Sequence, residues 1–354
     1  MQPTPVQETD AIVIGAGPVG LFQVFQLGLL ECRTHVIDAL PHAGGQCMEL
    51  YPDKPIYDIP GTPATTGRAL VASLQQQIAP FGVQFHLGQQ VNQIARQADG
   101  RFLVQTDRGT QLLAPVVIIA AGIGAFQPRR LKLDGIEAFE GRQLHYHATP
   151  SDVAGKDVVV VGGDVAALQA ALALTDTAAN IAPKSVTLLH RRDVLQAPMA
   201  DIAEMQMLIA AGSMRFMVGQ ISGFEAQGET LTVLEITDVD AALHRLPVDQ
   251  LVVFQGLSPK LGPVADWGLA MERKQLQVDT EKFETSEPGI FAVGDINTYP
   301  GKQKLILCGF HEATLAAYAA APLAFPGKKI PFQYTTTSPR LHQLLGVAKP
   351  VDAF

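Results

Sequence analysis

Cysteine is scarce in this chain. Its only cysteines are Cys32, Cys47 and Cys308, an odd number at wide spacing. That pattern fits neither the paired framework of a disulfide-rich domain nor the ligand spacing of a zinc site. The polar start, residues 1–4, also lacks the basic and apolar regions of a signal peptide. We therefore expect reduced thiols and a cytoplasmic protein.

Excess positive charge and long apolar runs are also missing. The formal net charge is −8, whereas binding to nucleic acid requires a concentrated basic face. Apolar runs such as residues 116–121 are far shorter than the ~20 residues that cross a bilayer. We expect neither nucleic acid nor a membrane as a partner. No metal site is expected either, because metal-ligand spacing is absent among the scattered histidines His145, His147, His190 and His311.

The composition is that of an α/β protein. Hydrophobic residues make up 47% of the 354 residues, charged residues only 17%, and there are 32 glycines. Such a chain is rich in buried parallel strands. Its length exceeds what one compact core usually holds and fits two domains.

The first informative motif is Gly-Ala-Gly-Pro-Val-Gly at residues 15–20. An apolar strand (11–14) precedes it, a helix (18–30) follows, and a second strand (34–37) ends in Asp38. In this motif Gly15 permits the tight turn, Gly17 lets backbone N–H groups approach a pyrophosphate, and Gly20 lets helix and strand pack closely. Asp38 is placed to accept hydrogen bonds from a ribose diol. The unit predicts a dinucleotide site.

The next segment, residues 41–52, contains two adjacent glycines followed by Gln46 and Tyr51. Glycines suit a backbone that lies against a flat ligand, where a Cβ would collide. Gln46 by hydrogen bonding and Tyr51 by stacking are natural neighbours of a flavin ring. The alternative is an ordinary surface loop with an exposed tyrosine.

A second strand-turn-helix unit begins near residue 157. Its strand (157–161) runs into Gly162 and Gly163, a helix extends to about residue 174, and a strand (185–189) ends in His190-Arg191-Arg192. An acid at this strand end would hold a free ribose hydroxyl, whereas arginines bind a 2′-phosphate through charge-assisted bonds. The pattern favours NADP over NAD. The alternative is a solvated basic cluster.

A third strand, residues 290–293, ends in Gly294-Asp295. Asp295 could accept a hydrogen bond from a ribityl hydroxyl of FAD, and the helix expected at 309–321 would direct its positive end toward the ring. Because this strand lies so far along the chain from the first motif, the FAD domain must be discontinuous. We predict an FAD domain of residues 1–124 and 288–354, with an NADP domain of residues 125–287 inserted in it.

With these residues in place, the chain resembles the thioredoxin-reductase-like ferredoxin–NADP reductases, two-domain flavoproteins without a redox dithiol. The shared motifs are GAGPVG at 15–20, GGQC at 44–47 with Tyr51, HRRD at 190–193 and FAVGDINTYPGK at 291–302. The resemblance implies an α/β fold of thioredoxin-reductase-like architecture, with two Rossmann-like, three-layer ββα dinucleotide-binding domains. It also implies a homodimer in which the C-terminal tail lies over the flavin of the partner subunit.

The resemblance assigns a role to particular residues. For FAD the implied contacts are Gly15, Gly17, Pro18, Asp38, Gln46, Tyr51, Val91, Phe126, Asp295, Tyr334 and Thr336. For NADP they are Gly162, Gly163, His190, Arg191 and Arg192. The implied reaction is hydride transfer between NADPH and FAD, coupled to one-electron transfer with ferredoxin or flavodoxin. The flavin performs this chemistry, so no catalytic side chain is expected.

Three differences from related proteins matter. Thioredoxin reductases carry a CxxC just before the second nucleotide strand, but residues 144–149 contain no sulfur, which excludes thioredoxin reduction by the usual route. Asp164 stands where the family has a third glycine, and Gln196 stands where it has a third arginine. Both changes should weaken NADP binding, since one lost charged hydrogen bond typically costs ~1.5–3 kcal/mol.

Two other functions remain open. A single-cysteine flavin oxidase or peroxidase would use Cys47 through a sulfenic acid. Alternatively, the chain is an FAD-binding redox sensor with a degenerate NADP site, as Asp164 and Gln196 suggest. A ferredoxin would be acidic, and a local basic dock could be formed by Arg129, Arg130, Lys132, Lys328 and Lys329.

Overall fold

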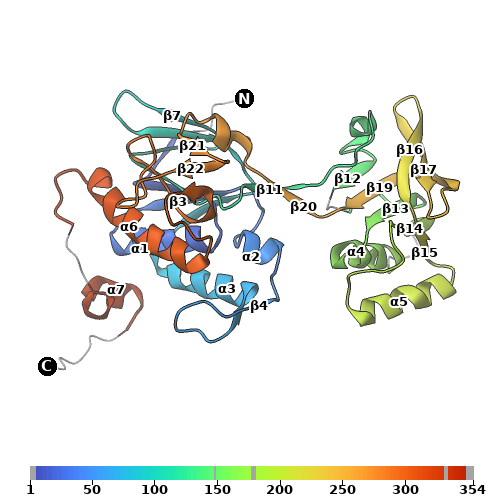
Figure 1. Cartoon of the computed structure of the whole chain (residues 1–354), viewed down its shortest axis with the longest axis horizontal. Helices are drawn as coiled ribbons and strands as arrows, with labels where there is room; N and C mark the ends of the chain where they lie inside the picture. The colour runs from blue at the N-terminus through green and yellow to red at the C-terminus, as the bar shows by residue number, and fades with distance from the viewer. Residues whose placement is uncertain (1–4, 147–148, 177–180, 331–333, 348–354) are drawn as a thin grey trace. The chain divides into compact units, whose positions relative to one another are not determined.

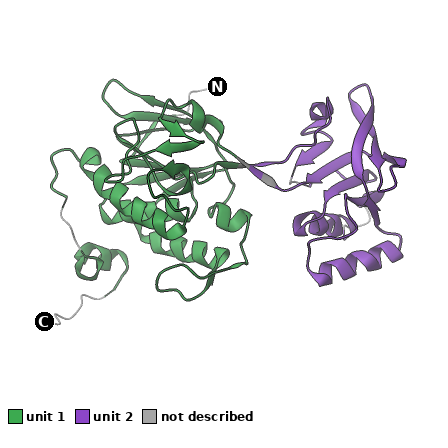
Figure 2. Ribbon diagram, viewed as in Figure 1, with its two compact units in different colours: residues 1–126, 259–354 green, residues 127–258 purple. Residues whose placement is uncertain are grey.

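The computed structural model describes residues 5–146, 149–176, 181–330 and 334–347. The chain divides into two units, each with its own core (Figure 2). Unit 1 consists of Met1–Phe126 and Pro259–Phe354, and unit 2 consists of Gln127–Ser258. The discontinuity that the third strand predicted is therefore present.

Unit 1 is built on a parallel sheet in the order β23-β10-β2-β3-β6 (Figure 1). Its strands are β2 (Ala11–Ile14), β3 (Thr34–Asp38), β6 (Gln84–Leu87), β10 (Val116–Ile119) and β23 (Ile290–Ala292). The central strands β2 and β10 are buried along their whole length, which explains their uninterrupted apolar sequences. Full burial of each such side chain contributes roughly 1.5–3 kcal/mol.

The two faces of this sheet are covered differently. Three helices cover one face: α1 (Pro18–Leu29), α3 (Gly67–Ile78) and α6 (Ile306–Ala324). The second core lies on the opposite face, with a four-stranded sheet in the order β1-β9-β8-β7, in which β7, β8 and β9 are antiparallel and β1 is parallel to β9. Its strands are β1 (Gln7–Glu8), β7 (Val91–Arg96), β8 (Phe102–Thr106) and β9 (Gln111–Ala114). The result is the predicted ββα layering.

Short elements complete unit 1. They are α2 (Gln46–Glu49), β4 (Pro55–Ile56), β5 (Thr65–Thr66), η1 (Ala79–Phe81), η3 (Gly262–Asp266), β21 (Met271–Glu272), β22 (Gln275–Gln277), η4 (Gly294–Ile296), β24 (Asn297–Thr298), η5 (Thr335–Thr337) and α7 (Pro339–Leu344). Helix α6 begins at Ile306, three residues before the predicted start. In the tail, Arg340 and Lys328 both form ion pairs with Glu31 just beyond α1.

Unit 2 repeats the layering on a smaller scale. Its parallel sheet has the order β12-β19-β13-β14-β15, with α4 and α5 packed on one face and an antiparallel sheet, β16-β17-β18, on the other. The bounds are η2 (Ile136–Phe139), β12 (Leu144–Tyr146), β13 (Asp157–Gly162), α4 (Val165–Thr175), β14 (Ser185–His190), α5 (Met199–Ala210), β15 (Arg215–Val218), β16 (Gln220–Gln227), β17 (Thr230–Thr237), β18 (Leu243–Pro247) and β19 (Gln250–Phe254). Both units thus have a Rossmann-like core.

Two paired strands, β11 (Ala125–Pro128) and β20 (Leu257–Lys260), carry the chain between the units. The return at β20 differs from the prediction, which kept the chain in the inserted domain as far as residue 287. Residues 259–287 belong to unit 1, because Val264, Leu269 and Leu276 are buried in its second core. No sequence motif marks this return.

Two properties of the described residues bear on possible partners. None of their helices is long and apolar enough to span a bilayer. Among them, no three His, Cys, Asp or Glu side chains are grouped in a way that could hold a metal ion.

An inward-facing histidine pair joins β3 to β6. His35 Nδ1 and His86 Nε2 are 3.0 Å apart, and their rings stack with centroids 5.2 Å apart. Burial lowers the pKa of both imidazoles, and the nearby His86 lowers that of His35 further. Both groups therefore favour the neutral form in the folded protein.

This pair should make the protein sensitive to acid. Because the folded-state pKa values lie below the ordinary value of 6.5, the unfolded chain binds more protons as the pH falls. The stability contribution is complete above pH 6.5 and is lost progressively below it. We expect the urea midpoint of the wild type to fall between pH 7.5 and 5.5, and that of His86→Gln to fall less. His311→Gln, which removes an exposed histidine, is the control. An equal fall in all three proteins would contradict the assignment.

Candidate functional site

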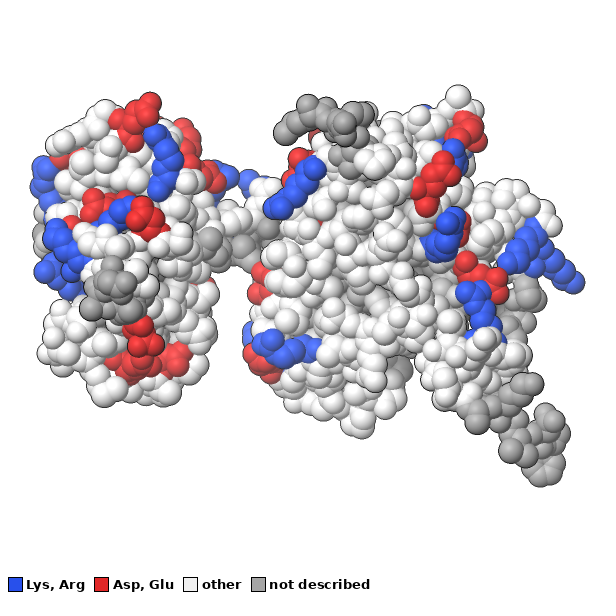
Figure 3. Space-filling model, turned by 180° about the vertical axis from the view of Figure 1, so that it is seen from behind, with Lys and Arg blue, Asp and Glu red and all other residues white. Residues whose placement is uncertain are grey.

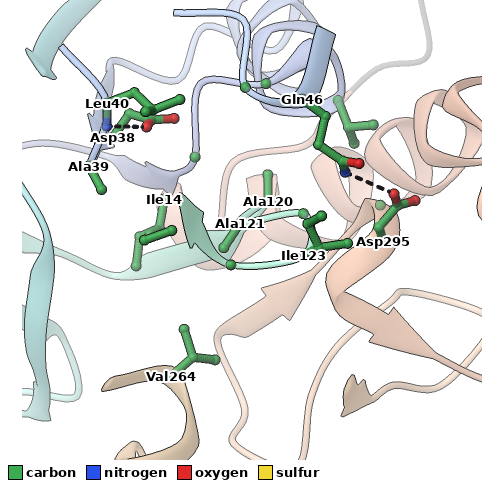
Figure 4. A pocket seen from close by; sticks show the side chains of 18 of the residues that line it. Ile14, Asp38, Ala39, Leu40, Gln46, Ala120, Ala121, Ile123, Val264 and Asp295 are labelled. Carbon is green, nitrogen blue, oxygen red and sulfur yellow. Dashed lines mark hydrogen bonds between the residues drawn. The ribbon is translucent and has the colours of Figure 1, made fainter. Parts of the chain in front are cut away.

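Unit 1 contains a cavity of about 240 Å³ at the carboxyl ends of β2, β3 and β10. This edge is where open parallel sheets bind ligands. Figure 4 shows Asp38 at one end and the hydrogen-bonded Gln46 and Asp295 at the other, with Ala120 and Ala121 between them. The cavity is therefore elongated and has polar groups at both ends.

In the glycine turn after β2, Gly15 and Gly20 are packed so closely against backbone that a side chain would not fit. A Cβ on Gly15 would lie 2.3 Å from the carbonyl oxygen of Ala120, and a Cβ on Gly20 would lie 1.9 Å from that of Gly15. Gly15 also has a φ of +111°, a conformation that favours glycine. These contacts bring α1 close to β2 and β10, as the motif predicted.

Gly17 faces open space instead. A Cβ on Gly17 would meet nothing within 4 Å, and the residue lines the cavity. It is the N-cap of α1, where no side chain accepts a hydrogen bond from the first turn. Uncapped amide donors and the positive end of the helix dipole together form an anion site. A ligand can therefore approach the turn at Gly17, whereas Gly15 and Gly20 are closely packed against backbone.

Asp38 ends β3 beside this turn. Its Oδ2 accepts from the Ala16 amide at 2.5 Å, and its Oδ1 accepts from the Leu40 amide at 2.8 Å. Burial raises the pKa of Asp38 above its usual range, whereas the two amide hydrogen bonds oppose that shift. Each oxygen keeps a further lone pair for a hydroxyl group in the cavity.

The far end of the cavity is formed by segments far apart in the sequence. Gln46, at the start of α2, donates from Nε2 to Asp295 Oδ2 at 3.1 Å. Asp295 in η4 also receives a bond at its carbonyl oxygen from Gln275 Nε2, 3.2 Å away. This end therefore has fixed polar groups for a ligand.

Cys47 and Tyr51 lie next to Gln46. Cys47 is 1% exposed, and its thiol donates to the Tyr51 hydroxyl at 3.7 Å. Burial raises the pKa of both groups, so the thiol and the phenol stay protonated at neutral pH. A thiolate, the reactive form of cysteine, is disfavoured here.

Most residues predicted to contact FAD surround this one cavity. They are Gly15, Gly17, Pro18, Asp38, Gln46, Tyr51, Val91 and Asp295. Of the other three, Phe126 lies in β11 and its side chain is outside the described part of the structure, whereas Tyr334 and Thr336 are exposed in the C-terminal tail and do not line the cavity.

Sequence reasoning missed one wall of the cavity. Leu261, Pro263, Val264 and Trp267 line it from η3 and the residues beside it. Trp267 also packs against the second core, and its Nε1 is buried without a hydrogen-bond partner among the described residues. These residues follow no motif, and the sequence analysis placed their segment in the other domain.

In unit 2 the predicted NADP residues gather at the carboxyl ends of β13 and β14. The His190 ring lies against Gly163, where an added Cβ would be 2.4 Å from it. Burial, Arg191 and Arg192 lower the pKa of His190, so its ring is neutral at pH 7. Both arginines are exposed and form no ion pair within the described ranges.

The two departures from the family pattern meet at this turn. Asp164 is the N-cap of α4, and its Oδ1 accepts from the Ala167 amide at 3.0 Å. Gln196 pairs with Asp164 in a β-bridge, and its backbone N–H donates to the carbonyl oxygen of Gly163 at 2.7 Å. The first turn of α4 is thus capped from within, unlike that of α1.

The two glycines of the first turn should respond differently to a methyl group. Gly20→Ala places a Cβ against backbone that cannot move aside, so we expect a loss of at least about 1–3 kcal/mol, the typical cost of overpacking. Gly17→Ala has open space and a φ of −68°. We expect a much smaller change in its thermal midpoint, measured without added ligand. If Gly20→Ala were the milder change, the packing described above would be incorrect.

The comparison with known proteins covers nearly the whole chain. Residues 9–320 match the family described as pyridine nucleotide-disulphide oxidoreductase. The ferredoxin–NADP reductase of Albidiferax ferrireducens is 59% identical over 345 residues, which are 97% of each chain. Ferredoxin–NADP reductase 2 of Cupriavidus metallidurans is 57% identical over 97% of this chain and 93% of its own.

Solved structures show the same architecture at low sequence identity. The thioredoxin reductase of Gloeobacter violaceus, 22% identical, superposes with a TM-score of 0.55 over 93% of this chain and 98% of its own. That of Lactococcus lactis, also 22% identical, gives 0.52 over 89% and 99%. These likenesses confirm the predicted fold. By its sequence relatives and its fold, the chain belongs to the pyridine nucleotide-disulphide oxidoreductase family and, within it, to the thioredoxin-reductase-like ferredoxin–NADP reductases.

Proposed function

We propose that this protein is an FAD-dependent ferredoxin–NADP reductase that exchanges electrons between NADPH and ferredoxin or flavodoxin. The names of relatives at 57–59% identity support the reaction. When bound, FAD accepts two electrons together as hydride and releases them one at a time. The protein's own side chains bind and orient the reactants.

The observation that carries the proposal is the uncapped start of α1 beside Asp38. A pyrophosphate would accept hydrogen bonds from the uncapped amides at the start of α1. Gly17 has no Cβ that would block its approach. The Asp38 carboxylate, held by two amides, is directed to accept from ribose hydroxyls. An anionic diphosphate that carries a ribose fits this end better than a simple anion or an apolar ligand.

The opposite end fits the ribityl chain and ring of FAD. Asp295 offers a carboxylate acceptor, and Gln46 holds that carboxylate in place while keeping its own amide oxygen for a further bond. Tyr51 also lines this end, and its phenol ring gives a flat surface. Val91, Val264 and Ala121 line the cavity with apolar surface that excludes water.

For the electron donor, we propose NADPH bound in unit 2. Arg191 and Arg192 are exposed at the end of β14, where an NADP 2′-phosphate would lie. His190 adds a neutral ring against Gly163, which can donate or accept a hydrogen bond without adding charge. Asp164 opposes this binding, because it occupies an amide of α4 and brings a carboxylate toward the pyrophosphate.

The acceptor must be reached without a sulfur relay in this chain. All three cysteines are free, and the sequence contains no CxxC. We therefore propose direct transfer to ferredoxin or flavodoxin. Of the predicted basic dock, Arg130 and Lys328 already pair with Glu140 and Glu31. On the face in Figure 3, acidic and basic side chains are interspersed, so a dock would be local.

We further propose a homodimer in the cytoplasm, in which the tail covers the flavin site of the partner subunit. The tail holds exposed apolar side chains, among them Tyr334, Leu345 and Val347, at 68%, 50% and 52% exposure. Ion pairs from Arg340 and Lys328 to Glu31 hold the tail to the segment just beyond the chain's own α1. Large apolar side chains exposed along one short segment are typical of a surface that a partner covers.

The capped turn of α4 favours the redox-sensor alternative. Reduction of the flavin by NADPH distinguishes a reductase from such a sensor. Anaerobic mixing with NADPH should bleach the bound flavin rapidly, and NADH should act more weakly. Arg191→Ala removes a phosphate contact, which we expect to weaken NADPH binding by ~1.5–3 kcal/mol, or roughly 10- to 100-fold in half-saturation, without changing that for NADH.

Arg245→Ala is the matched control, because it removes an arginine of unit 2 that pairs with Glu225 on the antiparallel sheet. Arg245→Ala should leave the half-saturation concentrations of NADPH and NADH unchanged. A colourless protein that stays so after incubation with FAD would refute the reductase assignment. A yellow protein that NADPH does not reduce would support the sensor instead.

The oxidase or peroxidase alternative needs a reactive thiol at Cys47. Since burial keeps that thiol protonated, we expect Cys47→Ser to retain its NADPH-dependent dye reduction within about tenfold, whereas loss of a true nucleophile costs roughly 10⁴-fold or more. Steady-state dye reduction measures this, with FAD content determined for each protein. Cys308→Ser is the control at a partly exposed cysteine.

A further inference from the structure

A buried ion pair lies directly behind the Asp295 end of the cavity. Glu312 of α6 is 0% exposed, and the side chain of Lys302 is 7% exposed. Lys302 Nζ is 2.5 Å from Glu312 Oε1. Neither residue lines the cavity, and the sequence analysis assigned a role to neither.

The Glu312 carboxylate accepts hydrogen bonds from several residues of the turn that follows β23. Its Oε2 accepts from the Gly294 amide at 2.7 Å and from Asn297 Nδ2 at 2.9 Å, and its Oε1 accepts from the Tyr299 hydroxyl at 2.9 Å. Lys302 Nζ also donates to the carbonyl oxygen of Gly294 at 2.8 Å. Both polar backbone atoms of Gly294 are therefore bound by the two members of the ion pair.

Gly294 itself lines the cavity and directly precedes Asp295. Its position is fixed from other sides as well, since a Cβ on Gly309 would lie 2.4 Å from Val19 and 3.4 Å from the Gly294 Cα. A single residue thus separates the cavity from a fully buried anion and an almost fully buried cation. Charges in such a place act strongly on one another and on a neighbouring ligand, because little water screens them.

A buried pair of this kind is not explained by stability alone. Desolvation of two charges often cancels their mutual attraction, and apolar residues of similar size can serve as well. The pair does supply a charge balance next to the site. Removing one member leaves the other as an uncompensated charge, and the sign of that charge depends on which member is removed.

We propose that Glu312 and Lys302 are positioning residues that hold the Gly294–Asp295 turn and balance the charge behind the flavin ring, and so set the flavin's reduction potential. This inference rests on the proposed binding of FAD in the cavity. Reduction adds negative charge to the flavin. An uncompensated Lys302 would therefore favour the reduced form, and an uncompensated Glu312 would disfavour it.

The test is the midpoint potential of the bound flavin, measured against reference dyes in the purified holoprotein. Glu312→Gln should raise the potential and Lys302→Met should lower it. Each change is expected to alter the ratio of affinities for reduced and oxidised FAD at least about tenfold, which is ~30 mV for a two-electron couple. The double variant should return toward the wild-type value. Lys302→Arg, which keeps the charge, should stay close to it.

The surface pair Arg96–Glu287 of unit 1 supplies the controls, because its two side chains are 48% and 39% exposed and neither lines the cavity. Glu287→Gln and Arg96→Met should leave the potential unchanged. Shifts of equal sign in Glu312→Gln and Lys302→Met, or shifts no larger than the surface controls, would overturn the inference. Should Glu312→Gln fail to fold, the contrast between Lys302→Met and Lys302→Arg decides alone.

The experiment separates this inference from the function on which it rests. If the wild type binds no FAD, the proposed function fails, and no potential exists to be tuned. If the wild type binds FAD and NADPH reduces it, but the variants lack the opposite shifts, only the role of the ion pair is refuted.

Discussion

The constraint on which the site depends is the need of a helix's first amides for hydrogen-bond acceptors. Three other helices meet it with their own side chains: Thr66 caps α3, Asp164 caps α4 and Ser338 caps α7. Helix α1 begins at Pro18 after its N-cap Gly17 and, like α2, α5 and α6, has no side-chain cap. The missing acceptor has to come from solvent or from a ligand in the cavity. The close packing of Gly15 and Gly20 holds α1 where those amides face the cavity.

The two ends of the cavity are held by different means. Backbone amides of the first unit fix Asp38, whereas Asp295 depends on a turn that is bound from behind by a side chain of α6. Burial raises the pKa of Cys47 beside the site, which disfavours a reactive thiolate there. The side chains act by position and by charge, which is why charges that do not touch the cavity can still matter.

Much of this could be predicted from the sequence where the relevant pattern is local. Gly15, Gly17 and Asp38 belong to one strand-turn-helix-strand unit, so their spacing alone brings them together. Gly294–Asp295 was predicted because a short apolar strand precedes it, and β23 does pair with β10 at the edge of the first sheet. The missing dithiol was evident from composition alone. The length of the inserted domain was not predictable, because residues 259–287 contain no motif and join unit 1 through the burial of Val264, Leu269 and Leu276.

The remaining differences come from contacts that spacing does not encode. Lys302 ends the family motif at 291–302 and Glu312 belongs to no motif, and only the packing of α6 against the turn after β23 buries the two together. The contact made by Asp164 was likewise not predictable from sequence spacing. The sequence predicted only that Asp164 weakens NADP binding, but in the structure its side chain caps its own helix by accepting a hydrogen bond from the Ala167 amide. Caps of this kind typically contribute about 1 kcal/mol of stability. The aspartate therefore stabilises α4 by occupying a donor that a nucleotide would otherwise use. In the proposed NADP site, Arg191 and Arg192 would then supply more of the binding energy at this turn.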